Sequence, residues 1–134
     1  MTDYRSALVY LMVLTSAADS DMTDSELQTI GEIVRFLPVF KGYNQEDLPA
    51  DSRECANLLA EENGLERVLD IVVASLPERL RETAYALSLE VVAADGVASQ
   101  EELRLLEILR HALDVERLVA AAIERGVRAR YMTA

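Results

Sequence analysis

The sequence predicts an all-α protein that folds as a single helical bundle of about seven helices. Apolar residues recur every three or four positions along almost all of the 134 residues, which is the spacing of one helix face. No segment shows the sustained alternation of a half-buried strand. Three prolines and five glycines provide little material for the many turns of a strand-rich fold.

The seven helices are expected, in chain order, at residues 3–18, 24–36, 51–62, 65–75, 78–94, 100–112 and 115–130. Pro38 ends the second helix, because a proline disfavours helical geometry in the residue before it. Residues 38–50 contain two prolines, a glycine and an asparagine. We therefore expect this stretch to be the one long connection.

Turn and capping residues support the later boundaries. Asn63-Gly64 is a typical stop signal at a helix C-terminus. Pro77 lies at the first turn of the helix at 78–94, where its missing N–H costs nothing. That helix carries apolar groups on more than one side and is expected to lie at the centre of the bundle. Asp114 is expected to be the N-cap of the last helix.

An internal repeat relates two parts of the chain at an offset of 76 residues. Residues 17–27 align without gaps on 93–103, with matching Ala-Ala-Asp, a Thr or Ser, a Glu and a Leu. The same offset superposes the helices before and after these segments. A repeated helical hairpin is the simplest explanation, since each pair of helices needs the other to cover its apolar face. The single domain and its two repeats are expected to span 1–134, about 2–77 and about 78–134.

Each repeated segment contains the signature of a capping box. In Thr23-x-x-Glu26 and Ser99-x-x-Glu102, a hydroxyl stands at the N-cap and a carboxylate stands three residues later. Gly96 can adopt the left-handed conformation that closes the preceding helix. These features predict two tight helical hairpins without any ligand.

Capping does not account for the aspartates that end the helix before each turn. Asp19 and Asp95 would face the negative end of a helix dipole, which is mildly unfavourable. N–H groups of the next helix, a basic partner or a cation could compensate this repeated cost. Ca²⁺ and Mg²⁺ take oxygen ligands of this kind. The candidate metal-binding residues are Asp19, Asp21, Glu26, Asp95 and Glu102.

The first acidic turn does not match an EF-hand loop. Counted from Asp19, the sixth position is Asp24 rather than glycine and the twelfth is Ile30 rather than glutamate. A bound cation would therefore be shared between the two turns or held loosely. Capping and solvation of the same carboxylates is the alternative interpretation.

The pattern Ala-Ala-Asp-Gly followed by Glu-Leu, at the end of a long helix, resembles the TerB-like family of tellurite-resistance proteins, which is related to the N-terminal domain of the DjlA co-chaperone. Residues 92–103 carry this resemblance and 76–81 agree with it. The resemblance implies a helical bundle with an internal two-fold repeat. It also implies a bacterial stress-response role near the inner membrane, with other tellurite-resistance proteins as partners. The acidic positions that it implies as metal chelators are Asp19, Glu26, Asp95 and Glu102, although the first repeat has Ser20-Asp21 where the glycine would stand.

The charge balance excludes several classes of partner. Thirteen basic and 24 acidic residues give a net charge of −11, which repels phosphate backbones and anionic lipid surfaces. Nucleic-acid binding is therefore not expected. No secretory signal and no run of 18 apolar residues is present. A cytoplasmic protein without a transmembrane segment is expected.

These observations favour a non-enzymatic binding module. The chain has no Gly-rich phosphate loop, nucleophile elbow or dinucleotide fingerprint, and no catalytic or organic-cofactor residue is predicted. The alternative is a structural adaptor whose acidic surface docks partner proteins without metal. A hydrolase that uses metal-bound carboxylates ranks last, because no nucleophile is evident outside the carboxylates.

The remaining chemically distinctive residues have structural interpretations. His111 has no Ser, Asp or Cys partner at a recognisable spacing, and Cys55 is expected to be a buried small hydrophobe. Phe36, Phe40 and Tyr43 are expected to pack the long connection onto the bundle. The basic segment 125–131 complements a helix C-terminus, and it could also dock onto the acidic half of another copy, which would give a homodimer.

Overall fold

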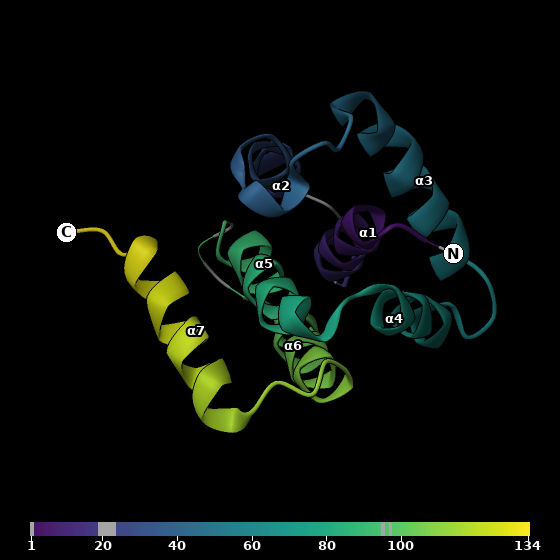
Figure 1. The fold of residues 1–134 in the computed structure, drawn as a ribbon. Helices are drawn as coiled ribbons and strands as arrows, with labels where there is room; N and C mark the ends of the chain where they lie inside the picture. The colour runs from purple at the N-terminus through teal and green to yellow at the C-terminus, as the bar shows by residue number, and fades with distance from the viewer. Residues whose placement is uncertain (1, 19–23, 95, 97) are drawn as a thin grey trace.

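The computed structural model describes residues 2–18, 24–94, 96 and 98–134, and within these residues every regular element is helical. The α-helices are α1 (Tyr4–Ser16), α2 (Asp24–Phe36), α3 (Leu48–Leu59), α4 (Gly64–Ser75), α5 (Arg81–Ala93), α6 (Gln100–Ala112) and α7 (Arg117–Arg130). Short 3₁₀ turns are η1 (Pro38–Phe40), η2 (Gln45–Asp47) and η3 (Glu78–Leu80). The predicted all-α bundle is confirmed (Figure 1).

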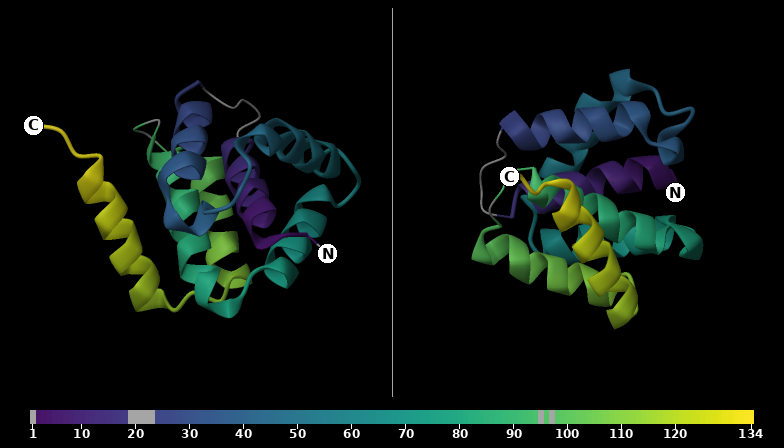
Figure 2. Two further views of the ribbon diagram at one scale, coloured as in Figure 1. Left: turned by 45° about the horizontal axis from the view of Figure 1, so that its top comes forward. Right: turned by 90° about the vertical axis from the view of Figure 1, so that its left-hand side faces the viewer.

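Two helices form the interior of the bundle. Helix α1 packs against α3, α4 and α5, and α5 also packs against α2, α6 and α7. Helix α7 lies at the outer edge of the molecule, on the side away from α3 and α4 (Figure 1). The C-terminal ends of α1 and α5 and the N-terminal ends of α2 and α6 all lie at one end of the bundle (Figure 2). The two hairpins of the repeat therefore turn at the same end.

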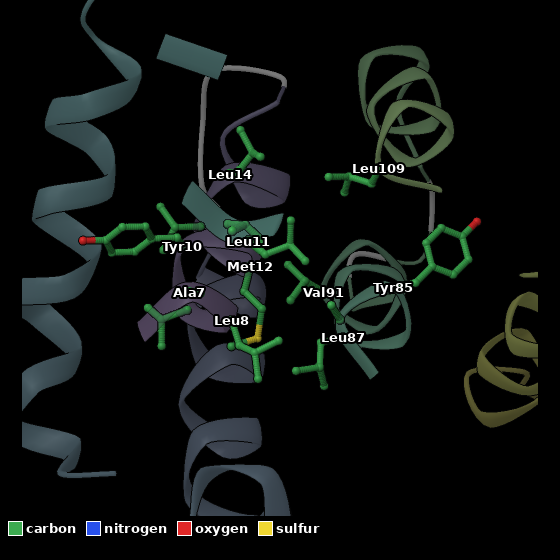
Figure 3. Packing of buried hydrophobic residues seen from close by; sticks show 14 of the residues in the cluster. Ala7, Leu8, Tyr10, Leu11, Met12, Leu14, Tyr85, Leu87, Val91 and Leu109 are labelled. Carbon is green, nitrogen blue, oxygen red and sulfur yellow. The ribbon is translucent and has the colours of Figure 1, made fainter. Parts of the chain in front are cut away.

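Helix α1 is buried on all sides. Every residue from 7 to 16 is buried, as expected for a helix enclosed by others rather than lying on a surface. Leu8, Leu11 and Met12 lie across from Leu87 and Val91 of α5 in the core (Figure 3). Helix α5 does lie at the centre, but it shares that place with α1.

The helix bounds follow the offset of 76 residues closely. When 76 is added to its residue numbers, α2 (24–36) gives 100–112, which are the bounds of α6. Helix α1 (4–16) gives 80–92, which is shifted by one residue from the bounds of α5, 81–93. Both helices of each hairpin therefore have equal lengths in the two repeats. The ranges predicted for the second and sixth helices are confirmed.

The long connection is shorter than predicted. Helix α3 begins at Leu48 rather than at 51, because Pro49 occupies its first turn, where the missing N–H needs no partner. Asp51 accepts hydrogen bonds from Ser6 Oγ at 2.9 Å and from Tyr43 Oη at 2.6 Å. These bonds tie both the connection and α3 to the start of α1.

The aromatic residues near the connection divide into two groups. Phe40 is buried and its ring meets that of Tyr43 edge-on, with centroids 5.7 Å apart. These two residues pack the connection onto the bundle, as predicted. Phe36 is 73% exposed, so the prediction was wrong for this residue. Its side chain stands at the last position of α2, beside Arg35.

The N-cap predicted for the last helix was also wrong. Asp114 has a φ of 53° and follows the end of α6 in the left-handed region, which Asp tolerates better than most residues. Glu116 is the N-cap of α7, and its carboxylate accepts a hydrogen bond from Leu118 N at 3.4 Å.

Helix α5 starts later than predicted, at Arg81, because residues 78–80 form the turn η3.

Cys55 has the structural role predicted for it. Its side chain is fully buried on α3, and Sγ lies 3.4 Å from the carbonyl oxygen of Tyr10 on α1. Burial raises the pKa of the thiol to about 12. Because the thiolate is the reactive form, this cysteine is chemically inert in the folded protein.

Candidate functional site

The candidate site lies at the end of the bundle where the two hairpins turn (Figure 2). Glu26 and Glu102 are the third residues of α2 and α6, and each is only 1% exposed. The other candidate ligands, Asp19, Asp21 and Asp95, lie outside the described residues. The structure therefore describes the environment of the two glutamates.

Glu102 belongs to the capping box that the sequence predicts. Its Oε1 accepts a hydrogen bond from Ser99 N at 2.9 Å, and Ser99 Oγ accepts one from Glu102 N at 3.1 Å. The second oxygen, Oε2, is buried and receives no hydrogen bond from the described part of the chain. A buried carboxylate oxygen without a partner is costly. Glu102 thus holds one buried carboxyl oxygen that no hydrogen bond from the described residues satisfies.

Glu26 occupies the equivalent place in the first repeat. It is buried in the first turn of α2, which also contains the exposed Asp24. Carboxylates here favour the positive end of the helix dipole. Its predicted capping partner, Thr23, lies outside the described residues, so the first capping box stays a prediction. Glutamate is rarely fully buried unless it is paired, and the two repeats bury one at the same position.

Replacing the hydroxyl group of Ser99 tests how much its hydrogen bond with Glu102 N contributes to the free energy of unfolding. Ser99→Ala is expected to lower the free energy of unfolding by about 1 kcal/mol, because the N–H of Glu102 loses its acceptor. Urea unfolding followed by circular dichroism measures this loss. Ser99→Thr keeps a hydroxyl at the N-cap and is expected to retain most of the stability. An equal loss in both variants would contradict the role of this hydrogen bond.

The described carboxylates alone do not make up a complete set of metal ligands. Among the described residues, no three His, Cys, Asp or Glu side chains gather closely enough to hold one. The buried oxygen of Glu102 fits a hard divalent cation, which prefers carboxylate ligands. Further ligands would have to come from Asp19, Asp21 and Asp95.

One buried carboxylate was not predicted from the sequence. Glu90 of α5 is 8% exposed, accepts a hydrogen bond from Tyr131 Oη at 2.8 Å, and pairs with Arg130 Nη1 at 2.6 Å. Burial and this carboxylate raise the pKa of Tyr131 to about 12. Glu90 thereby fastens the end of α7 to α5. The repeat contains a sequence signal for this residue. At the offset of 76, Glu90 aligns with Leu14, so an acidic residue stands where the first repeat has an apolar one.

A comparison with protein-family models matched residues 5–124 to the family described as tellurite resistance protein TerB. No curated protein and no solved structure gave a match. Within the described ranges, no helix has the length and apolar character needed to cross a membrane. The matched region contains α1 to α6 and half of α7, including both acidic turns. The family resemblance inferred from the repeated turn is confirmed, and the chain belongs to the TerB family.

Proposed function

We propose that this protein is a non-enzymatic, cytoplasmic binding module that holds a divalent cation at its two acidic turns and docks partners of a tellurite-resistance or stress-response system. The buried Oε2 of Glu102 is the observation that carries the proposal. It would supply a ligand atom in the first turn of the helix that follows the second acidic turn. The proposed ligands are Asp19, Asp21, Glu26, Asp95 and Glu102.

Electrostatics gives the cation a physical role at this end of the bundle. Carboxylates brought together at the two turns would repel one another, and a bound cation would neutralise them. Because the turns belong to different hairpins, a shared ion would link α1–α2 to α5–α6. Ligands that are oxygen only favour Ca²⁺ or Mg²⁺ over softer metals.

Among the residues that the structure describes, no nucleophile–base pair is evident, which supports a binding role over an enzymatic one. His111 is exposed, and its Nε2 lies 3.1 Å from Arg110 Nη2. The thiol of Cys55 is buried with a pKa raised to about 12. The thiol is therefore not an activated nucleophile near neutral pH, and His111 contacts a guanidinium rather than a hydroxyl or a thiol that it could activate.

A metal-free adaptor is the second candidate function. It is favoured by the capping box, because Glu102 already uses Oε1 to hold the N-terminus of α6. In this case the turns are structural, and the net charge of −11 serves to attract basic partner surfaces. Capture of partners would then weaken with added salt and would be unaffected by chelator.

Calorimetric titration with Ca²⁺ and with Mg²⁺ separates the two functions. We expect the wild-type protein to bind one of these ions, and the double variant Asp19→Asn/Asp95→Asn and the single variant Glu102→Gln to bind at least tenfold more weakly. Asp47→Asn/Asp70→Asn removes two exposed carboxylates elsewhere and is expected to bind normally. Equal weakening in this control would show a diffuse charge effect. Absence of binding to the wild-type protein would reject the metal site in favour of the adaptor.

A further inference from the structure

Helix α7 is held to the bundle by a small apolar contact. Its main packing partner is α5, and of its 14 residues only Ala120 and Val127 are buried. Helix α1, in contrast, is buried at every position from 7 to 16. Because burial of apolar area is the dominant favourable term in helix packing, one alanine and one valine hold α7 weakly.

Helix α6 adds little to this contact. Cavities of about 390 and 300 Å³ follow one another along the groove between α6 and α7. Both cavities are lined by Leu89 of α5, by Leu103 and Leu106 of α6, and by Glu124 of α7. Figure 2 shows α7 lying apart from α6 toward its C-terminal end. The groove therefore leaves α7 with α5 as its one extensive support.

Two hydrogen bonds between tyrosine and glutamate fasten α7 to α5. Near the middle of α7, Glu124 accepts a hydrogen bond from Tyr85 Oη of α5 at 2.8 Å. Directly after α7, Tyr131 Oη donates to Glu90 of α5 at 2.8 Å. The other carboxylate oxygen of Glu90 lies 2.6 Å from Arg130 Nη1. Hydrogen bonds to an ionised acceptor are stronger than neutral ones, so the two tyrosine hydroxyls contribute a large share of the attachment.

A detached α7 would not remain helical. Isolated helices shorter than about 12–15 residues are marginal in water, and α7 has 14 residues with Gly126 among them. The core around α1 would remain, because the main packing partners of α1 are α3, α4 and α5. Release of α7 therefore unfolds one helix and leaves the rest of the bundle in place.

We propose that α7 is a detachable strap, which opens and unfolds as a unit while α1 to α6 stay folded. Local openings of this kind have lower free energies than global unfolding. Opening uncovers an apolar face of α5 and α6 that includes Tyr85, Val92 and Leu106, each at most 5% exposed when α7 is attached. The hydroxyl groups of Tyr85 and Tyr131 hold the strap closed, and access to this face depends on them.

Native-state hydrogen exchange, followed residue by residue by NMR in EDTA, tests the opening independently of any cation. The amides of α7 are expected to exchange at least about 100-fold faster than those of α1, because they need only the local opening. Tyr131→Phe removes one hydroxyl and keeps the ring, and it is expected to speed exchange in α7 by about five- to tenfold. Tyr85→Phe is expected to have a similar effect.

Tyr43→Phe is the matched control. It removes a hydrogen bond of the same kind, which Tyr43 Oη donates to Asp51 at 2.6 Å, and that bond stays intact when α7 opens. Exchange in α7 is therefore expected to be unchanged, whereas exchange that requires global unfolding becomes faster. Exchange of α7 and α1 at the same rate in the wild-type protein would overturn the proposal. Equal acceleration of α7 by Tyr43→Phe and Tyr131→Phe would also overturn it.

A thiol reagent tests whether the apolar face is uncovered. Leu106→Cys places a thiol in the wall of the groove, and the fully buried Cys55 of α3 reports global unfolding in the same molecule. The thiol at position 106 is expected to react at least about 100-fold faster than Cys55, and a further five- to tenfold faster when Tyr131→Phe is added. Equal reactivity of the two thiols, or reaction at position 106 that does not respond to Tyr131→Phe, would contradict the release of α7.

Discussion

Leu11→Ala is expected to lower the free energy of unfolding by about 3–5 kcal/mol, one of the two largest effects of a single substitution predicted for this protein. Leu11 is fully buried on α1, the helix that α3, α4 and α5 enclose. Removing its isobutyl group leaves a cavity that the surrounding helices can fill only in part. Urea unfolding measures the loss, which corresponds to a decrease in Tm of about 10–20 °C.

Leu118→Ala is the matched control. Its side chain is 75% exposed on α7, so the same truncation is expected to change the free energy of unfolding by less than about 0.5 kcal/mol. Similar losses in the two variants would contradict the placement of α1 at the centre of the bundle.

Gly64→Ala is expected to destabilise the protein by about 2–4 kcal/mol, although alanine is ordinarily the better helix former. A Cβ atom at this position would lie 2.5 Å from the carbonyl oxygens of Leu58 and Leu59. These are backbone atoms at the end of α3, so the added methyl group can be accommodated only if α3 and α4 move apart. Thermal unfolding monitored by circular dichroism measures the effect.

Gly126→Ala provides the opposite expectation within the same protein. Gly126 lies inside α7, and a Cβ atom there would meet nothing within 4 Å. The substitution is therefore expected to stabilise the protein by about 0.5–1 kcal/mol, through helix propensity and a less flexible unfolded chain. A stabilising Gly64→Ala would show that the α3–α4 corner is more open than the structure describes.

The elements that the sequence predicted best are those with strong local signals. The bounds of α6 agree because Ser99 and Glu102 form a capping box, and α2 ends where Pro38 follows. Local signals failed where two residues competed for one role. Asp114 is the better N-cap by residue type, yet Glu116 takes that position because Asp114 has a left-handed backbone at the end of α6. Tertiary packing, rather than residue type, decides such a case.

The burial of α1 could not be predicted from apolar spacing alone. Thr15 and Ser16 interrupt the apolar pattern, yet both are fully buried. Their hydroxyl groups donate to the carbonyl oxygens of Leu11 and Met12 at 2.8 and 3.0 Å. A hydroxyl that is satisfied within its own helix can enter a core at little cost. Helical spacing shows which face is apolar, but it does not show how many neighbours surround the helix.

The candidate site was predicted in part. The repeat identified Glu26 and Glu102, and both lie buried at equivalent helix starts. Their burial was not predicted, because an acidic residue in a first helical turn is usually a solvent-exposed capping group. The tie between Glu90 and the end of α7 was missed, since its partners lie about 40 residues away in the sequence.

Thermal unfolding with and without divalent cations tests the proposed metal site most directly. The protein is unfolded in EDTA and then with Ca²⁺, Mg²⁺, Mn²⁺ or Zn²⁺, each at the same ionic strength. A cation that binds the folded state, present at 100 times its Kd, is expected to add about 2.7 kcal/mol, which raises Tm by about 5–10 °C. We expect this rise with Ca²⁺ or Mg²⁺, and its loss in Asp19→Asn/Asp95→Asn. An unchanged Tm with every cation would contradict the metal site and leave the acidic turns as structural caps.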